Sequence, residues 1–425
     1  MPPSSHDHSH GPDPDAPPPS PEALARRRRA VWLMLLLLVP VGLATIVGLV
    51  LLWPSSEPTP AAQAAAVALP PGTTYPDGRV VSVETFDCGI DPAAAPQLCA
   101  TAVVEILGGE GAGDFEQVEL PPEVVAAGVS EGDTLVLTRD AGAEGGPAYG
   151  FYDYARDTPI IVLAVAFAVV VGLVARLRGL ASLVGLAFAF FVLLQFVLPG
   201  LLSENSPTLV SLVGSAAIMF VVLYLAHGFS ARTTTALVGT LFGLTLVAVM
   251  GSLAVSAARL TGLTSEETVQ LQGFDPTLSF SGLVLAGIVV AGLGVLNDVT
   301  ITQASAIWQL NEVSPGMTWR ELYTRGMSVG RDHIASTVYT IVFAYAGAAL
   351  PLLLLFEVYP TPIWTLVTSS ALAEEVIRTM VGAIALVLAV PVTTAAGAFF
   401  AKAADTEAGA ATERRVTALR TRFAR

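Results

Sequence analysis

Long apolar segments and one polar region alternate along the chain. An apolar segment at 31–53 is followed by a polar region that extends to residue 157. Seven further apolar segments lie at about 159–175, 180–202, 207–226, 234–258, 279–306, 334–356 and 378–401. At a rise of 1.5 Å per residue, each can cross a hydrocarbon core of about 30 Å, some with tilt. The pattern predicts an all-α polytopic membrane protein with about eight transmembrane helices. A small β-rich extracytoplasmic domain is expected between the first and second spans.

Domain boundaries follow from the same pattern. The N-terminal part is expected to comprise a disordered cytosolic tail with an Arg cluster at 1–30, a first transmembrane helix at 31–53 and a linker at 54–71. The remainder is expected to comprise the β-rich domain at 72–153, a seven-helix membrane domain at 158–402 and a basic cytosolic tail at 403–425. The first apolar segment could instead be a signal peptide. It lacks a small-x-small cleavage site directly after it, so an uncleaved span is preferred.

Short β-leaning runs divide the polar region. They lie at 79–85, 100–107, 115–120 and 134–137, separated by Gly, Pro and Asp clusters. Such runs predict a β-rich domain, with a five-stranded barrel and a sandwich as open alternatives. The chain's two cysteines, Cys88 and Cys99, lie here. They would form a disulfide in an oxidising compartment, and two free thiols are the alternative.

Composition indicates a membrane protein, and the distribution of charge indicates which segments are cytosolic. With 53% hydrophobic and 13% charged residues and a mean hydropathy of +0.66, the chain is too apolar for an ordinary soluble domain. If the N-terminus is cytosolic, 16 of the 21 Lys and Arg residues fall on the cytosolic side. Because basic residues near span ends resist translocation, we expect a plasma-membrane protein with both termini cytosolic and residues 54–157 outside. Acidic residues concentrate outside, so the net charge of −14 indicates no basic partner.

An acidic residue interrupts the apolar stretch 282–312. Asp298 follows Asn297 and, at 3.6 residues per turn, shares one helix side with small and hydroxyl residues. The other members of this stripe are Gly287, Ala291, Gly294, Thr302 and Ser305. A charge near the bilayer interior costs at least about 2.5 to 3.5 kcal/mol, so Asp298 should face protein or a water-filled cavity. It is the first candidate for a functional site.

Two polar clusters lie at span ends. His227 ends the fourth predicted span and could relay protons, although an interfacial cap is the preferred interpretation because Gly follows it. Arg331, Asp332 and His333 lie at the inner mouth of the seventh predicted span, where Asp332 and His333 could form a donor and acceptor pair.

A third cluster begins the last span. Glu374 and Arg378 have the favourable i, i+4 spacing of a helical ion pair, which would leave Glu375 over. In the tail, the alternating His6, His8 and His10 could bind a divalent metal weakly, but a solvated tail without a metal site is preferred.

Enzymatic motifs are absent from the sequence. No HExxH, GxSxG or phosphate-binding Walker sequence occurs, and the candidate acids and histidines fall on opposite predicted membrane faces. We therefore expect no enzyme, no cofactor and no nucleic-acid partner. An intramembrane hydrolase is the least favoured function.

The helical half resembles a known family. The stretches LAGIVVAGLGVLNDVTITQASAIWQLNE, GMSVGRDHIASTVYTIVFAYAGAALPLLLLF and AEEVIRTMVGAIALVLAVPVTT are similar to the YibE/F family of bacterial integral membrane proteins. The resemblance covers about residues 155–402. It implies a multispan membrane protein without an established activity. The matching positions are Gly292, Gly294, Asp298, Val299, Gly330, Arg331, Asp332, Glu374, Glu375 and Arg378. Asn297 departs from the pattern, where a hydrophobic residue is expected.

Two functional hypotheses follow. In the first, the protein is a small-solute or ion transporter, not driven by ATP on its own. Asp298 carries a proton or cation, Thr302 and Ser305 line the path, and Glu374 and Glu375 collect cations outside. Gly287, Gly292 and Gly294 would serve helix packing. In the alternative, the protein is a non-transporting scaffold in the lipid bilayer whose outer domain binds an envelope protein. The expected orientation of the spans places the polar residues in two layers, a cytosolic-side cluster around Asp298, Arg331 and Asp332 and an outer acidic cluster at Glu374 and Glu375.

Overall fold

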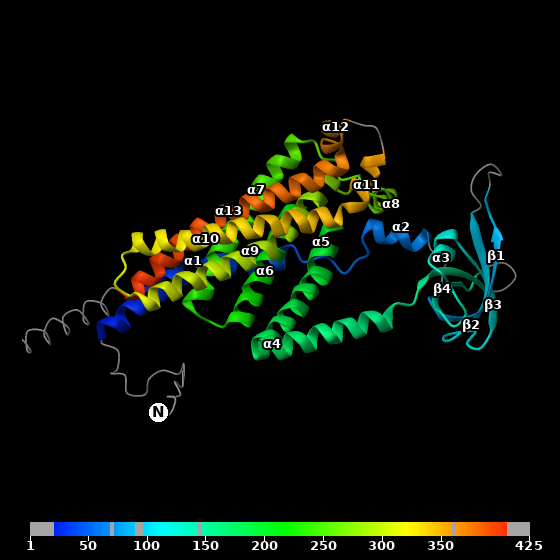
Figure 1. Ribbon diagram of the computed structural model, residues 1–425, viewed down its shortest axis with the longest axis horizontal. Coiled ribbons are helices and arrows are strands. Elements are labelled where there is room, and N and C mark those ends of the chain that lie inside the picture. Colours follow the sequence, from blue (N-terminus) through cyan, green and yellow to red (C-terminus); the bar gives the residue numbers. More distant parts are fainter. Residues whose placement is uncertain (1–20, 69–71, 90–96, 143–146, 359–361, 406–425) are drawn as a thin grey trace, which may run out of the picture. The chain divides into compact units, whose positions relative to one another are not determined.

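The computed structural model describes residues 21–68, 72–89, 97–142, 147–358 and 362–405 (Figure 1). These residues form two compact units. The first, which we call the helical unit, comprises the described residues of Met1–Pro54, Val184–Thr268 and Ser279–Arg425. The second comprises the described residues of Ser55–Leu183 and Val269–Leu278. It contains helix α2 (Pro60–Ala68) and all the described strands.

Five antiparallel strands form the small β domain expected for the polar region. They are β1 (Asp77–Asp87), β2 (Leu98–Ile106), β3 (Phe115–Leu120), β4 (Thr134–Asp140) and β5 (Ala148–Tyr154), and the short helix α3 (Pro122–Ala126) follows β3. Their order is β3-β2-β1-β4-β5, and the outer strands β3 and β5 also contact each other. The sheet therefore closes into a barrel with the connectivity of an OB-type fold, and the sandwich alternative is wrong.

Alternating side chains fill the barrel. Along β2, Ala100, Ala102, Val104 and Ile106 point inward and are at most 1% exposed. Gly78 of β1 lies where a Cβ would collide with Val104 and come within 2.8 Å of Leu137. The interior is thus a packed core, and ligand contacts must use its rim or outer surface.

A disulfide joins the first two strands. Cys88 and Cys99 are bonded, with Cα atoms 5.7 Å apart. Cys99 pairs with Phe86 in the register of β1 and β2, so the bond ties neighbouring strands together at one end of the hairpin. The predicted disulfide is present, and the alternative of two free thiols is wrong.

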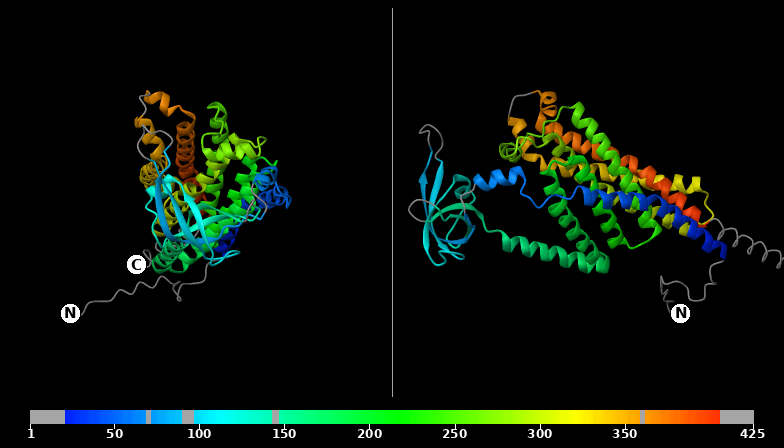
Figure 2. Two further views of the ribbon diagram at one scale, coloured as in Figure 1. Left: turned by 90° about the vertical axis from the view of Figure 1, so that its right-hand side faces the viewer. Right: turned by 180° about the vertical axis from the view of Figure 1, so that it is seen from behind.

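Helices α7 (Ala231–Ala257), α9 (Phe280–Val313) and α13 (Ser370–Asp405) form the centre of the helical unit. Around them pack α1 (Pro21–Leu51), α6 (Pro207–His227) and α10 (Trp319–Ala348). Figures 1 and 2 show α9, α10 and α13 side by side. Their common core is built from aliphatic side chains, including Leu244, Val289, Leu296 and Ala385.

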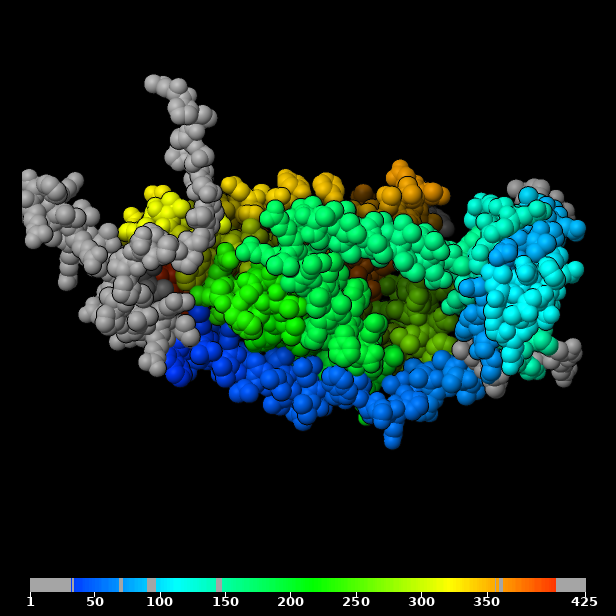
Figure 3. Space-filling view, turned by 90° about the horizontal axis from the view of Figure 1, so that it is seen from below, coloured from blue at the N-terminus to red at the C-terminus, as the bar shows by residue number. Residues whose placement is uncertain are grey.

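Helix α1 lies on the surface of this bundle. It contacts α6, α7 and α13, and Figure 3 shows it in blue beside the green helices. An apolar groove of about 440 Å³ remains between α1, α6 and α7, with Leu37, Leu212 and Leu241 among its lining residues. Helix α1 is therefore an integral part of the bundle.

Glycines allow the central helices to approach closely. A Cβ on Gly243 of α7 would lie 2.5 Å from Leu296 of α9, and a Cβ on Gly330 of α10 would lie 2.6 Å from Val390 of α13. Such contacts bring helix backbones together in a medium where apolar burial alone gives no association between helices.

One buried amide ties three helices together at these contacts. The side chain of Gln303 on α9 is 1% exposed, and its Nε2 donates to the carbonyl oxygen of Gly326 on α10 at 2.9 Å and to Oγ1 of Thr394 on α13 at 2.7 Å. Nearby, the hydroxyls of Thr240 and Thr300 hydrogen bond at 2.7 Å between α7 and α9. These bonds fix the register of the central helices.

The described helices include six candidate membrane spans, whereas the sequence predicts eight spans. In the described chain, six helical stretches are long and apolar enough to cross a membrane: Met34–Leu51, Asp157–Leu201, Pro207–His227, Ala231–Ala257, Phe280–Val313 and Ser370–Lys402. Asp157–Leu201 covers two predicted spans and contains α4 (Asp157–Val192), a π-helical turn and α5 (Leu198–Leu201). Arg176, with φ 53°, breaks α4 at the predicted boundary between those two spans.

The predicted span 334–356 is not among these six. Its helix α10 starts earlier, at Trp319, because Thr318 and Glu321 form a capping box: the Glu321 amide donates to the Thr318 hydroxyl at 3.3 Å, and the Thr318 amide donates to the Glu321 carboxylate at 2.8 Å. The Thr318 amide and the Thr318 hydroxyl both donate to the Glu321 carboxylate, at 2.8 and 2.9 Å, and these two bonds lower the pKa of Glu321. Helix α10 ends at Ala348, and α11 (Leu350–Val358) follows it.

The disulfide generates the first prediction. We expect the double variant Cys88→Ser/Cys99→Ser to lower the free energy of unfolding of the barrel by about 2 to 3 kcal/mol, because the bond closes a short loop in the unfolded chain. Pulse proteolysis of the full-length protein in increasing urea, followed at the barrel, would measure the change. Equal resistance of the variant and the wild type would contradict this role.

The glycine contacts generate the second. Gly330→Ala should destabilise the helical unit by about 1 to 3 kcal/mol, because the new Cβ meets Val390 and the Gln303 amide in a packed interface. Gly294→Ala is the matched control, since a Cβ there meets nothing within 4 Å. Thermal unfolding in detergent compares the two. A larger loss for Gly294→Ala would show that another surface covers that face of α9.

Candidate functional site

A buried carboxyl group lies near the start of α13. Glu374 is only 6% exposed. Its Oε2 accepts a hydrogen bond from the hydroxyl of Thr264, 2.9 Å away in the loop between α7 and α8 (Glu266–Phe274). Its Oε1 is buried and has no hydrogen-bond partner among the described residues. The buried carboxyl group of Glu374 therefore accepts one hydrogen bond within the described chain, from the neutral hydroxyl of Thr264.

An ion pair lies beside this carboxyl group on the same helix. The Nη1 of Arg378 and the Oε1 of Glu375 are 2.9 Å apart, and both side chains are about a quarter exposed, at 26% and 28%. The Nε of Arg378 is buried without a partner within the described chain. A Cβ on Gly287 of α9 would lie 3.9 Å from the Nη2 of Arg378, so the guanidinium extends toward α9.

The predicted pairing in this cluster is wrong. The sequence predicted an ion pair between Glu374 and Arg378, with Glu375 unpaired. In the structure Glu375 forms the ion pair with Arg378, and Glu374 forms none within the described chain. Both acids are within reach of Arg378, because residues three and four positions apart share a helix side. Burial decides between them, since a guanidinium paired with the more exposed Glu375 keeps part of its hydration.

The stripe of small and hydroxyl residues around Asp298 is less buried than Glu374. Asp298 and the stripe members Gly287 and Gly294 are exposed on the helical unit, and Thr302 and Ser305 are partly buried. The Thr302 hydroxyl donates to the backbone carbonyl of Asp298 at 2.7 Å, within the same helix. The stripe therefore forms an outer face of the described bundle.

Two neighbours of this stripe point inward. Asn297 is partly buried, and its Oδ1 is buried without a hydrogen-bond partner in the described residues. Gly292 is the predicted packing glycine that lies inside, where a Cβ would be 3.3 Å from Val247 of α7.

The other predicted site residues lie apart. On α10, Arg331 and Asp332 are exposed and His333 is partly buried; the Nε of Arg331 donates to the carbonyl of Met327 at 3.2 Å. His227 is exposed at the end of α6, where Gly228 has a φ of 75° and ends the helix.

The polar residues of the helical unit form two layers. Arg378 lies beside Gly287 of α9, and Gly330, next to Arg331, lies beside Gln303 of the same helix. These two positions on α9 are separated by about 24 Å at 1.5 Å per residue. The polar residues therefore do not converge on a single site.

Sequence reasoning missed two residues. Thr264 lies in a loop far from Glu374 along the chain, and no pattern in the sequence indicates their contact. Gln303 carried a signal, because an amide in an apolar segment needs hydrogen-bond partners. It was overlooked because it lies off the side of the helix that carries Asp298.

Metal binding has no support in the described residues. No group of three or more His, Cys, Asp or Glu side chains there could hold a metal ion. His6, His8 and His10 lie outside the described residues.

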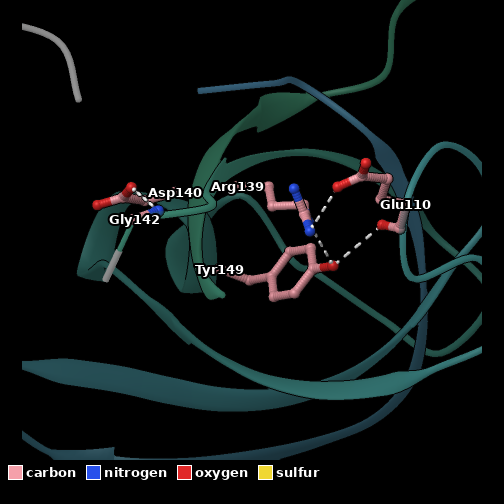
Figure 4. Close-up of polar contacts among 5 residues, drawn as sticks. All are labelled: Glu110, Arg139, Asp140, Gly142 and Tyr149. Carbon is pink, nitrogen blue, oxygen red and sulfur yellow. Dashed lines mark hydrogen bonds and ion pairs between the residues drawn. The ribbon is translucent and has the colours of Figure 1, made fainter. Parts of the chain in front are cut away.

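The barrel carries a polar cluster of its own, shown in Figure 4. Arg139 of β4 has a side chain only 12% exposed, and its Nη2 lies 2.9 Å from Oε2 of Glu110 in the β2–β3 loop. Its Nε donates to the hydroxyl of Tyr149 on β5 at 3.2 Å, and that hydroxyl donates to the backbone carbonyl of Glu110 at 3.3 Å. Side chains from two other elements, the β2–β3 loop and β5, thus hold the guanidinium in place.

Comparison with known proteins identifies the helical half. A family model described as YibE/F-like protein matches residues 163–403, which is more than half of the chain. No curated protein and no solved structure matches. The matched region contains Asp298, Arg331, Glu374 and Arg378, whereas the barrel lies outside it. With this match and its apolar helices, the chain is a multi-pass membrane protein that belongs to the YibE/F-like family.

Proposed function

We propose that the helical unit transports a small solute or ion and that Glu374 carries the proton or cation that drives it. The observation behind this proposal is the buried Oε1 of Glu374, which has no partner in the described chain. Burying a charged carboxylate costs several kcal/mol unless it is paired. In this proposal a transported proton or cation is the missing partner of Oε1, and Glu374 releases it when another partner takes its place.

Arg378 can supply that partner. The structure shows Arg378 paired with Glu375, and we assign this arrangement to the state in which Glu374 holds the transported ion. When Glu374 loses its proton, the guanidinium is drawn to it, because its unpartnered Nε is on the same helix side four residues away. An exchange of Arg378 between the two acids would couple the ion to a side-chain movement beside Gly287, where no side chain obstructs it.

In this proposal Asp298 is a second acid on the path. It lies about 16 Å along α9 from the position beside Arg378. The two acids would serve opposite sides of the membrane. The proposed orientation has both termini in the cytosol and residues 54–157 outside, because Lys and Arg residues concentrate in the segments that it makes cytosolic. The Cys88–Cys99 disulfide supports this orientation, because such bonds persist in oxidising compartments.

A non-transporting scaffold is the second candidate. It is supported by the Thr264–Glu374 hydrogen bond, which ties the α7–α8 loop to α13 and could serve architecture alone. In that case the barrel would bind an envelope protein.

The third prediction concerns Glu374. We expect Glu374→Gln to lower proton flux at least tenfold, because an amide keeps the hydrogen bond to Thr264 but cannot take up a proton. Flux would be measured with pyranine-loaded proteoliposomes under a valinomycin-imposed potassium potential. Glu312→Gln, at an exposed acid near the end of α9, is the matched control and should keep wild-type flux.

Thermal unfolding of the same samples separates the two functions. A transporter should show lost flux with little change in melting temperature. Unchanged flux together with a lower melting temperature would reject transport through Glu374 and favour the scaffold.

The fourth prediction concerns Asp298. Asp298→Asn should also lower flux at least tenfold and leave the melting temperature unchanged, because Asp298 is exposed on the helical unit and its carboxylate forms no hydrogen bond or ion pair with the described residues. The same liposome assay measures this. Wild-type flux in this variant would remove Asp298 from the path without affecting the role of Glu374.

A further inference from the structure

The barrel has a pocket at its rim. It has a volume of about 660 Å³, which lies within the range of about 300 to 1,000 Å³ found for small-ligand sites. Its walls come from the segment before β1, the β2–β3 loop and the end of β4. Thr74, Tyr75, Asp77, Glu110 and Arg139 supply its polar side chains.

One wall of this pocket is held rigidly. Arg139 is fixed by Glu110 and Tyr149, as Figure 4 shows, and its backbone forms two hydrogen bonds with Thr74, of 2.8 and 3.1 Å. The carboxylate of Glu110 remains 81% exposed although it is paired. A fixed donor and an accessible acceptor are thus adjacent before any ligand binds, so little ordering would be needed on binding.

Aromatic rings lie at the edge of the same pocket. Tyr75, one of its lining residues, is 49% exposed and packs edge-on against Tyr152, which is 60% exposed, with ring centroids 5.0 Å apart. Tyrosines left in water offer an apolar ring face and a polar hydroxyl together, which suits a ligand that is apolar on one side and hydroxylated at its edge.

The charge of the domain narrows the ligand class. OB-type barrels bind oligonucleotides and oligosaccharides. Residues 72–153 contain 15 acidic and 2 basic residues, a net charge of −13. Nucleic-acid binding depends on cationic side chains that neutralise phosphates, and this domain would repel them. A neutral oligosaccharide meets no such repulsion.

We propose that the rim pocket of the barrel binds a neutral oligosaccharide. A sugar ring stacks on Tyr75, and its hydroxyl groups donate to the carboxylates of Asp77 and Glu110 and accept from Arg139. Hydroxyls act as donors and acceptors at once, so they match a wall that presents both kinds of group. This binding function belongs to the barrel and does not depend on transport by the helical unit.

A glycan array tests this proposal with the full-length protein. The protein would be labelled in lipid nanodiscs, because maltoside detergents carry a competing sugar head group. The array would hold neutral oligosaccharides, including the β-1,4-linked tetramers of glucose and N-acetylglucosamine. We expect selective binding to at least one of them, with the affinity then measured by calorimetry.

Variants assign the binding to the pocket. Tyr75→Ala and Glu110→Gln should each weaken binding at least fivefold, the first by removing the stacking surface and the second by weakening the support of Arg139. Phe115→Ala is the matched control, because Phe115 is an equally accessible aromatic residue, 61% exposed, that does not line the pocket. It should leave the affinity unchanged.

Three results would overturn the proposal. They are no selective binding anywhere on the array, binding that survives Tyr75→Ala, and stronger binding of single-stranded oligothymidine or of spermine than of any sugar. The last result would assign the pocket to a charged ligand.

Discussion

The central helices depend on close backbone approach at glycines. Where Gly243 meets Leu296 and Gly330 meets Val390, any side chain would force the helices apart. In a bilayer the lipid is as apolar as the helix surface, so these contacts and the hydrogen bonds they permit must hold the bundle together. The Gln303 amide reaches α10 and α13 together beside Gly330, where a Cβ would lie 3.2 Å from the amide nitrogen and oxygen.

This constraint separates structural from functional polar groups. The Thr240–Thr300 pair and the Nε2 of Gln303 are satisfied across helices and so contribute to packing. The Oε1 of Gln303 has no hydrogen-bond partner among the described residues, but it belongs to a neutral amide and faces the close contact at Gly330, where a Cβ would lie 3.2 Å from it. Glu374 differs because its unsatisfied oxygen belongs to a group that can change charge. In the proposed transport function, the cost of burying that charge is what allows Glu374 to bind and release an ion.

Much of the architecture could be predicted from the sequence. Apolar length located the helices, β-leaning runs located the barrel, and the two cysteines indicated their bond. The start of α10 could not be located by hydropathy, because the Thr318–Glu321 capping box begins the helix in a polar segment. A T-x-x-E pattern was present there and carries that information.

The candidate site was harder to predict than the architecture. Helical periodicity shows which residues share a side of a helix, but it does not show what that side contacts. It placed Asp298 on a stripe of small residues, yet it could not tell whether another helix covers that stripe, and in the helical unit it is exposed. It also placed both Glu374 and Glu375 near Arg378. Only the position of Thr264, from a distant loop, shows which acid is buried.

Charge is distributed unevenly between the barrel and the rest of the chain. The whole chain has a net charge of −14, and residues 72–153 carry −13 of it, so the remaining residues are close to neutral. On the barrel, the net charge of −13 repels polyanions from the rim pocket at distances within the Debye length of about 8 Å. Selectivity at the pocket then has to come from ring stacking and hydroxyl geometry, because attraction between opposite charges would favour any cation equally.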